Sequence, residues 1–298
     1  MTNLATLTRT RMKLALRNKM FFFFSVIMPL GFFFLYAGIF AKGDPKMVLF
    51  YLGPVLALNV MGSFWGLSAT LVMYREQGIL RRFHVAPVTS SDMLISSVLA
   101  NFVLTLPTVL SILLLARFVF HVPNFGNIWA MFLFVCVGTV SFGSLGLVVA
   151  SVTNTMQETQ VLNQLLWFPL IFLSGATLPV AFLSKAVQRA ALFLPATYLV
   201  SGLQQATYAS QSITMLLTQF ISLVAWAALS FFVATQLFRW EPEIKIPRNA
   251  KLWAVATVIP FILLGFWEQY NGRILAEARA AFVSATGQGA PHTDAPKN

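Results

Sequence analysis

Charged residues are scarce in this sequence, making up 10% of its 298 residues, whereas 58% are hydrophobic. Soluble globular domains carry charged residues at about 25%. The composition therefore excludes that class and predicts a polytopic membrane protein. The net charge of +11 does not indicate nucleic-acid binding, because the basic residues stand in short segments beside apolar runs, as in cytoplasmic loops that face anionic lipid.

Cysteine and clustered histidine are also missing. Cys136 is the only cysteine and lies in an apolar segment, which excludes a disulfide framework and a thiolate metal site. The three histidines are isolated, so no HExxH metal motif exists. Ser144 in FGSLG has Phe142 where a hydrolase nucleophile elbow requires glycine. A membrane-embedded enzyme is therefore disfavoured and stays, with a non-transporting membrane scaffold, as the alternative to transport.

Two further absences concern energy. No GxxxxGK[ST] motif occurs, so the chain has no P-loop, and we expect it to carry no cofactor of its own. No predicted span has an acidic or basic residue near its middle, as ion channels and ion-coupled carriers usually do. Together these absences favour a transporter of bulky, largely apolar cargo whose energy is supplied by a partner.

Long uncharged runs are what the sequence has in abundance. About 20 apolar residues in a helix cross a hydrocarbon core of about 30 Å, and several runs reach that length. The predicted fold class is an all-α polytopic membrane protein with six transmembrane helices. They are placed at residues 20–41, 47–74, 93–116, 128–151, 160–178 and 213–238.

The N-terminal residues 1–19 predict a basic amphipathic helix on the membrane surface, with Arg9, Lys13 and Arg17 on one face. The uncharged run 20–41 that follows has 22 residues, longer than the 7–15 of a signal-peptide core, so we interpret it as a retained first span. Twelve of the twenty Lys and Arg fall in segments that the predicted spans place on the same side of the membrane as the N-terminus. The N-terminus is therefore expected in the cytoplasm.

One charged island separates the second and third predicted spans, and we predict a short amphipathic helix over residues 75–88. Ile79, Leu80 and Phe83 fall on one side at helical spacing. We expect a partner to bury this small apolar face. The charge pattern by itself fits a solvated loop equally well. The residues 89–92, TSSD, then predict a capping box at the start of the next span.

The island and two later segments carry a family resemblance. REQGILRRFHVAPVTSSDML resembles the E-x-G-x-L-R-R-x-x-x-x-P-V segment after the second span of type-2 ABC transporter permeases, the exporter-type membrane family. LSGATLPVAF and LPATYLVSGLQ resemble that family's S-G-x-x-x-P and L-P-x-x-Y segments, and FRWE at 238–241 resembles its usual terminus. The resemblance covers residues 1–241 and assigns 20–241 to the transmembrane domain.

The resemblance implies a function and partners. The chain would be the permease subunit of an ATP-binding-cassette exporter in the cytoplasmic membrane, paired with itself or with a similar permease. Two ATPase subunits beneath this pair would bind ATP and Mg²⁺. The cargo would be a drug-like or lipid-like amphiphile. The island would be the coupling helix that docks on the ATPase through Glu76, Gly78, Ile79, Leu80, Arg81, Arg82, Phe83 and Pro87.

Amide side chains form a stripe on the fifth predicted span. Amides in a membrane helix need partners or water, so the stripe either bonds to neighbouring helices or faces the substrate. Both interpretations stay open here. The candidate substrate pathway consists of Asn59, Ser63, Gln160, Asn163, Gln164 and Trp167.

Residues 179–212 are too interrupted for a continuous span and too apolar for a free loop. They predict a re-entrant helical hairpin that dips into the outer leaflet, where broken backbone is tolerated if protein covers it. The residues that define this region are Ser174, Gly175, Pro179, Pro195 and Tyr198.

The C-terminal extension, residues 242–298, lies outside the resemblance. Its apolar run 252–267 has 16 residues, just short of the usual 17–25 for a span. Trp253 and Trp267 flank the run as interfacial residues do. We favour a seventh span followed by an external polar tail; a helix lying in the interface is the alternative.

Overall fold

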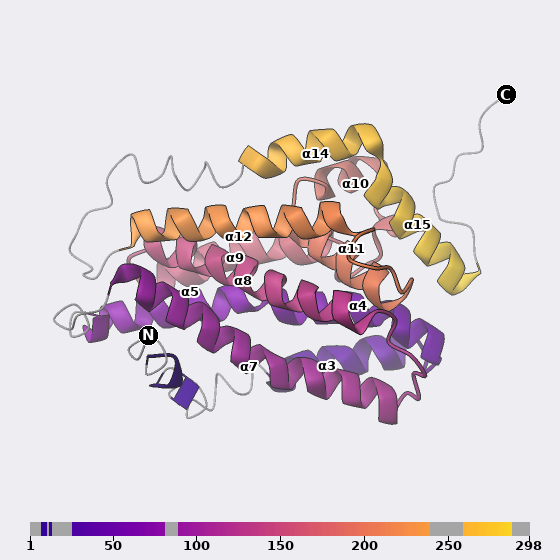
Figure 1. Ribbon diagram of the computed structural model, residues 1–298, viewed down its shortest axis with the longest axis horizontal. Coiled ribbons are helices and arrows are strands. Elements are labelled where there is room, and N and C mark those ends of the chain that lie inside the picture. The colour runs from indigo at the N-terminus through magenta and orange to yellow at the C-terminus, as the bar shows by residue number, and fades with distance from the viewer. Residues whose placement is uncertain (1–6, 11, 14–25, 81–88, 239–258, 288–298) are drawn as a thin grey trace.

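The predicted all-α fold is confirmed by the computed structural model, which describes residues 7–10, 12–13, 26–80, 89–238 and 259–287. None of these residues is in a strand. Most of the long helices run along the longest axis of the molecule (Figure 1). The interfacial helix predicted for residues 1–19 lies largely outside the described residues.

Four helices within the described ranges are long and apolar enough to cross a membrane. One of them is a 32-residue unit that α4 and α5 form together around Gly62, at the predicted second span. The other three correspond to the predicted third, fourth and sixth spans. The bounds are α4 Pro45–Met61, α5 Ser63–Glu76, α7 Ser90–Phe118, α8 Ile128–Val152 and α12 Leu217–Leu237.

The predicted first span is described from residue 26 onward. It contains α3, Met28–Leu35, which continues into a π-helical turn, η2, Tyr36–Phe40. Together α3 and η2 form an apolar helix, Met28–Phe40, of 13 residues, which is shorter than the four membrane-capable helices. Pro29 sits in the first turn of α3, where its missing N–H has no intrahelical partner to lose.

The predicted capping box is confirmed at the start of α7. The Thr89 hydroxyl accepts a hydrogen bond from the Asp92 N–H (3.1 Å), and the Asp92 carboxylate accepts one from the Thr89 N–H (3.2 Å). Two of the four free N–H groups at the helix start are satisfied in this way.

The fifth helix differs from its predicted bounds. We expected a span at 160–178, but α9 runs Met156–Leu173 and begins four residues earlier. The cause is a second N-terminal cap, because the Thr155 hydroxyl accepts from the Glu158 N–H. Polar residues in its first turns keep α9 outside the set of four membrane-capable helices in the described chain.

Short helices occupy the region of the predicted hairpin. They are η3, Val180–Phe182, α10, Lys185–Ala191, and α11, Pro195–Thr207. Every residue of α11 is buried. Gly53 of α4 allows this close packing, because a Cβ there would lie 2.6 Å from the Cα of Gln204. We call the end of the molecule where α10 and α11 lie the far end.

The opposite end is built where α5 ends, α7 begins and α8 meets α9; we call it the Glu76 end. A separate cluster of buried side chains holds it together, including Leu71, Leu80, Met93, Leu147 and Val233. Because Val233 belongs to the last turns of α12, that helix ends at the Glu76 end as well.

The C-terminal helices lie at the far end (Figure 1). They are α14, Ile259–Asn271, and α15, Arg273–Thr286, joined at Gly272 with φ of 64°. In α15, Phe282 packs edge-on against Phe50 and Phe182. The predicted run 252–267 is described only from residue 259, and its helix continues beyond Trp267.

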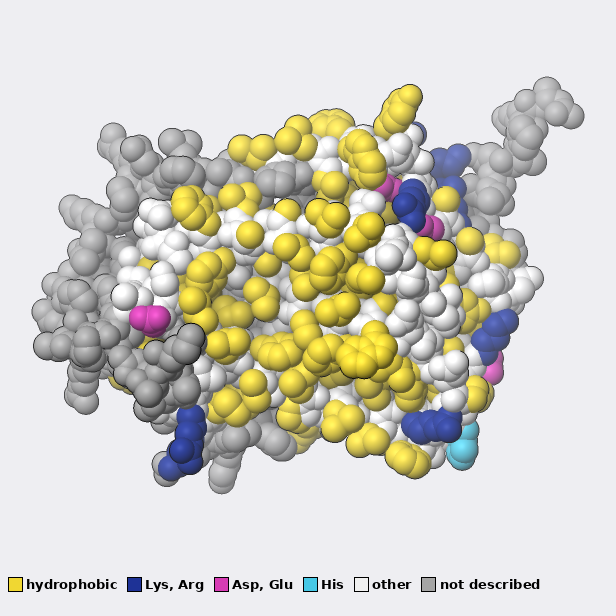
Figure 2. Space-filling model, in the orientation of Figure 1, with side chains coloured by type: hydrophobic (Ala, Val, Ile, Leu, Met, Phe, Trp, Pro, Cys, Tyr) yellow, Lys and Arg dark blue, Asp and Glu magenta, His cyan; other side chains and the backbone are white. Residues whose placement is uncertain are grey.

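The surface agrees with a membrane-embedded bundle. Figure 2 shows hydrophobic side chains spread over the middle of the visible face, with the charged side chains toward its two ends. Exposed apolar residues of this kind are found on several of the long helices, for example Leu110, Leu114, Trp129 and Ile221.

Candidate functional site

The segment predicted to dock on an ATPase begins directly after α5. The helix ends at Gln77, Gly78 turns the chain with φ of 66°, and helical backbone begins again at Ile79. A positive φ suits glycine because it has no Cβ to clash. Arg81, Arg82, Phe83 and Pro87, the remaining residues of this prediction, lie outside the described residues.

Leu80 corrects one part of the prediction. We expected an outside partner to bury the apolar face of this segment, but Leu80 is 0% exposed and packs in the cluster at the Glu76 end with Leu71 and Met93. Ile79 is half-buried. Leu80 therefore anchors the segment to the bundle, and Ile79 is the described apolar residue that keeps some surface for a partner.

Glu76 also has a partner within the chain. Its carboxylate Oε1 accepts a hydrogen bond from the Met156 N–H at 2.9 Å. Met156 is the first residue of α9, so the carboxylate lies at the positive end of that helix. The side chain is still exposed, which leaves it accessible to a partner in addition to this bond.

Arg75 is a residue that the sequence reasoning missed. It is only 1% exposed, and its Nη1 donates to the carbonyl oxygens of Ala150 (2.9 Å) and Thr153 (3.0 Å) at the end of α8. The last carbonyls of a helix lack intrahelical donors, and a cation beside them is favourable. The available signal was an arginine that directly follows 28 uncharged residues.

The amide stripe of α9 is divided between two faces. Asn163 is fully buried and pairs with Ser68 of α5: its Nδ2 donates to the Ser68 hydroxyl (2.8 Å), which donates to Asn163 Oδ1 (3.1 Å). Gln160 and Gln164 are exposed. Asn163 thus ties two helices together, whereas the two glutamines lie on the outer surface of this chain.

The other pathway candidates lie on the α5 side of α9. Trp167 is half-buried and packs against the rings of Phe64 and Trp65, with centroids 5.9 and 6.2 Å apart. Asn59 is half-buried, and Ser63 is 6% exposed. The structure therefore does not bring the six candidates to one open surface.

The exposed face of α9 combines the two glutamines with apolar side chains. Val161 and Leu165 are each 68% exposed, and Phe168 and Phe172 stack on each other further along the helix. A face with this mixture suits either lipid or a second protein surface that needs a few hydrogen-bond donors and acceptors.

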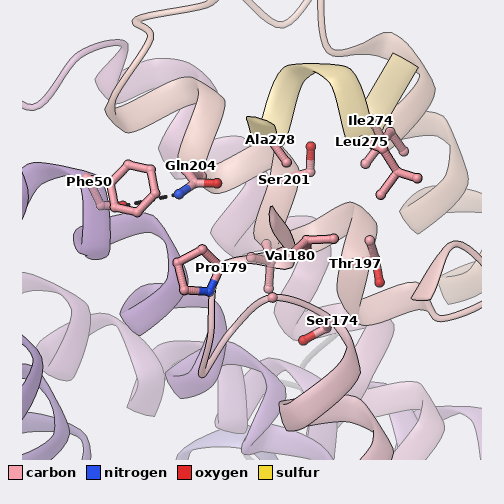
Figure 3. Close-up of a pocket in the computed structure, with 12 residues that line it drawn as sticks. Phe50, Ser174, Pro179, Val180, Thr197, Ser201, Gln204, Ile274, Leu275 and Ala278 are labelled. Carbon is pink, nitrogen blue, oxygen red and sulfur yellow. Dashed lines mark hydrogen bonds between the residues drawn. The ribbon is translucent and has the colours of Figure 1, made fainter. Parts of the chain in front are cut away.

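The residues that mark the predicted hairpin meet at the far end. Ser174, Gly175 and Pro179 line a small cavity with Ser201 and Gln204 of α11, and α15 closes it from the other side (Figure 3). Its volume is about 10 Å³, the space of about one water molecule. The cavity is therefore too small for an amphiphilic cargo.

Pro195 and Tyr198 serve the packing of α11. Pro195 occupies the first position of the helix, where its missing N–H costs nothing. Tyr198 is 0% exposed and its hydroxyl donates to the carbonyl of Leu192 at 2.9 Å. A buried tyrosine normally requires such an acceptor, so this contact secures the turn between α10 and α11.

The described part of the chain is an all-helical bundle with several membrane-capable helices, which places the protein in the class of polytopic α-helical membrane proteins. Residues 2–208 match the family model described as "ABC-2 type transporter". This match covers more than half of the chain, and the chain belongs to that family. The expected resemblance is confirmed, and the protein is a membrane permease component.

Three relatives are each similar to this chain over somewhat more than 60% of its length. "Inner membrane transport permease YhhJ" of Escherichia coli (strain K12) is 27% identical over 186 residues, covering 62% of this chain and 48% of the relative. "Probable multidrug ABC transporter permease YbhS" of the same organism is 22% identical over 188 residues, covering 63% and 47%. "Linearmycin resistance permease protein LnrN" of Bacillus subtilis (strain 168) is 26% identical over 182 residues, covering 61% and 47%. The chain spans about half the length of the curated relatives it matches.

Proposed function

We propose that this chain is the membrane subunit of an ATP-driven exporter that moves a drug-like or lipid-like amphiphile out across the cytoplasmic membrane. The observation that carries the proposal is the place of residues 76–80, the described part of the segment that resembles the E-x-G-x-L-R-R pattern. They lie where α5 ends, at one end of a bundle of membrane-capable helices. The relatives named for multidrug transport and linearmycin resistance support an amphiphilic substrate.

A separate ATPase supplies the energy and docks at the Glu76 end. The sequence has no P-loop of its own. Ile79 retains some exposed surface, and the two arginines of the motif, Arg81 and Arg82, follow it in the sequence. Guanidinium groups form strong paired hydrogen bonds with carboxylates, so the partner surface would carry acidic residues.

A second permease subunit, either a copy of this chain or a similar one, covers the exposed face of α9. This arrangement would place Gln160 and Gln164 at the contact between two subunits, together with apolar side chains such as Leu165. Polar groups at such a site would be hydrated or would contact the cargo, since lipid offers them no hydrogen bonds.

The topology follows from the positions of the two ends. With the Glu76 end and the N-terminus in the cytoplasm, the far end is external, and α10 and α11 re-enter from outside. The helix α12 ends at the Glu76 end, whereas α15 packs at the far end. The chain between α12 and α15 therefore leads from the Glu76 end to the far end, which supports a seventh crossing that includes the apolar run 252–267.

The docking test is co-purification with the tagged permease of a P-loop ATPase that is encoded by a neighbouring gene. Arg81→Glu together with Arg82→Glu should abolish capture, because like charges at a desolvated contact cost about 2–5 kcal/mol of association. The matched control is Arg189→Glu, an exposed arginine at the far end, which should leave capture unchanged. Full capture by the double variant would mean that the segment is only a charged turn.

The topology test is labelling of single cysteines in a Cys136→Ala background. A membrane-impermeant maleimide should label Gly43→Cys and Tyr270→Cys in intact cells, and Gln77→Cys only after permeabilisation. Gln77 and Tyr270 are both exposed, the latter at 92%. External labelling at position 77 would reverse the proposed orientation, and protection of position 270 would remove the seventh crossing.

A further inference from the structure

Arg75 and Glu76 are adjacent in the last turn of α5, immediately before the segment that we propose docks on the ATPase. Their two side chains bond to the two sides of the turn between α8 and α9: Arg75 to Thr153 before it and Glu76 to Met156 after it. Family membership does not specify these contacts. These hydrogen bonds connect the end of α5, where the docking segment begins, to the α8 and α9 helices of the bundle.

The arginine holds the end of α8. Its Nη1 donates to the Ala150 and Thr153 carbonyls, and the residue is only 1% exposed. A guanidinium group is strongly held by carbonyl partners in such a place, because leaving it buried without them carries a large desolvation cost. The bond geometry fixes where α8 must end relative to α5.

The glutamate holds the start of α9. Its carboxylate accepts from the Met156 N–H, and the charge lies at the positive end of the helix. The turn itself is rigid: the Asn154 N–H donates to Glu158 Oε2 at 2.7 Å, and Thr155 caps the first turn. A displacement of the turn is therefore passed on to α9 as a unit.

A second contact joins α5 and α9 further from the Glu76 end. The buried pair of Ser68 and Asn163 joins α5 to α9 between the Glu76 end and the tryptophan contacts. With bonds at two levels, α9 follows α5 in translation and also in rotation. The glutamines exposed on α9 are then moved by whatever moves the end of α5.

We propose that Arg75 and Glu76 are positioning residues that transmit movement of the ATPase-docking segment to α9 by clamping the turn between α8 and α9. This inference rests on the proposed function, since it needs an ATPase that moves the segment. It assigns to Glu76 a role different from direct docking: the carboxylate acts inside the permease.

The first test measures the clamp without any ATPase. Spin labels at Gln77→Cys and Gln157→Cys, both exposed positions, report the distance across the turn in a Cys136→Ala background. Glu76→Ala and Arg75→Met should broaden the distance distribution. Glu76→Gln should keep it narrow, because the amide oxygen still accepts from the Met156 N–H.

The matched control is Asp92→Ala. Asp92 is also a carboxylate at a helix start at the Glu76 end and is half-buried, but it caps its own helix, α7. This variant should leave the distance across the turn unchanged. Equal broadening in Asp92→Ala would overturn the proposal, because the change would then reflect general loosening of this end.

The second test measures coupling in the complex with the ATPase, using rhodamine 6G as the transported probe in proteoliposomes. Glu76→Ala should capture as much ATPase as the unmodified chain, yet ATP-dependent uptake should fall by about tenfold, within the usual range for coupling between sites. Glu76→Gln should restore most of the uptake.

Two results would overturn the clamp. Loss of ATPase capture by Glu76→Ala with a narrow distance distribution would make Glu76 a docking residue. Normal uptake despite a broadened distribution would make the contacts purely structural. Failure of the proposed function has a different signature, because the unmodified chain would then capture no P-loop ATPase while the distance measurements still report the clamp.

Discussion

The Glu76 end and the far end of this bundle both contain packed apolar side chains, but they differ in the contacts that are added to this packing. At the Glu76 end, Arg75 and Glu76 satisfy the free backbone groups of two helix ends. At the far end, Phe282 packs between aromatic rings and α11 is buried along its whole length. Hydrogen bonds depend steeply on geometry, whereas apolar burial is non-directional. Directional contacts suit the end that we propose must pass on movement.

The two ends also differ in what the family covers. The match to the ABC-2 family ends at residue 208, so it includes the parts of α5, α7, α8 and α9 at the Glu76 end and the short helices α10 and α11. The helices α14 and α15, which cover the far end, lie outside the matched residues. The far end thus combines helices inside the family match with α14 and α15, which lie outside it and which we call the cap. The packing that attaches the cap can be tested.

The largest expected effect is on this added packing. Phe282→Ala removes a ring that is 4% exposed and contacts Phe50 and Phe182. Deleting a buried aromatic side chain costs about 3–5 kcal/mol of unfolding free energy, which thermal unfolding in detergent should show. The control is Val283→Ala, its 39% exposed neighbour on α15. Equal losses in both variants would mean that α15 does not stabilise the far end.

A smaller effect is expected between the two ends, on α9. Asn163→Leu removes the paired hydrogen bonds between Asn163 and the buried Ser68, whose hydroxyl then keeps only the Trp65 carbonyl of its own helix. The expected cost is about 1–3 kcal/mol in unfolding free energy. Gln164→Leu, on the exposed face, should change stability by only about 0.5 kcal/mol and alter rhodamine 6G uptake instead. If Gln164→Leu were the more destabilising of the two, the division of the amide stripe would be wrong.

The smallest effect is expected for a single polar contact of the cap. Arg279 of α15 donates to Gln188 Oε1 of α10 at 2.6 Å. Arg279→Ala should lower the unfolding free energy by about 1 kcal/mol, the net value of one such hydrogen bond. Arg189→Ala, an exposed arginine beside Gln188, should stay within about 0.5 kcal/mol. A loss for Arg279→Ala as large as that for Phe282→Ala would contradict the apolar basis of the far end.

Much of the architecture could be predicted because membrane helices are specified locally. Uncharged runs of sufficient length indicated the helices around residues 47–74, 93–116, 128–151 and 213–238, and a four-residue cap signal indicated the start of α7. The motif between the second and third spans indicated the family. Each of these signals depends on residues that are neighbours in the chain.

The start of α9 and the partner of Leu80 were not predictable in the same way. Thr155 caps α9 within a segment that reads as a polar turn, so the helix begins before the apolar run does. Leu80 sits on a helical face that a soluble partner could bury equally well. Whether it faces inward depends on where α7, α8 and α12 place their own apolar side chains.

The sequence by itself therefore determined the membrane class, the helical composition, the family and the position of the docking segment, because hydropathy and short motifs are local properties. Only the tertiary structure decided that Arg75 and Glu76 hold the turn between α8 and α9, that Asn163 faces Ser68 while Gln164 faces outward, and that α15 covers the far end. These contacts join residues about 75 to 240 positions apart. Which faces of two helices meet depends on the packing of the whole bundle.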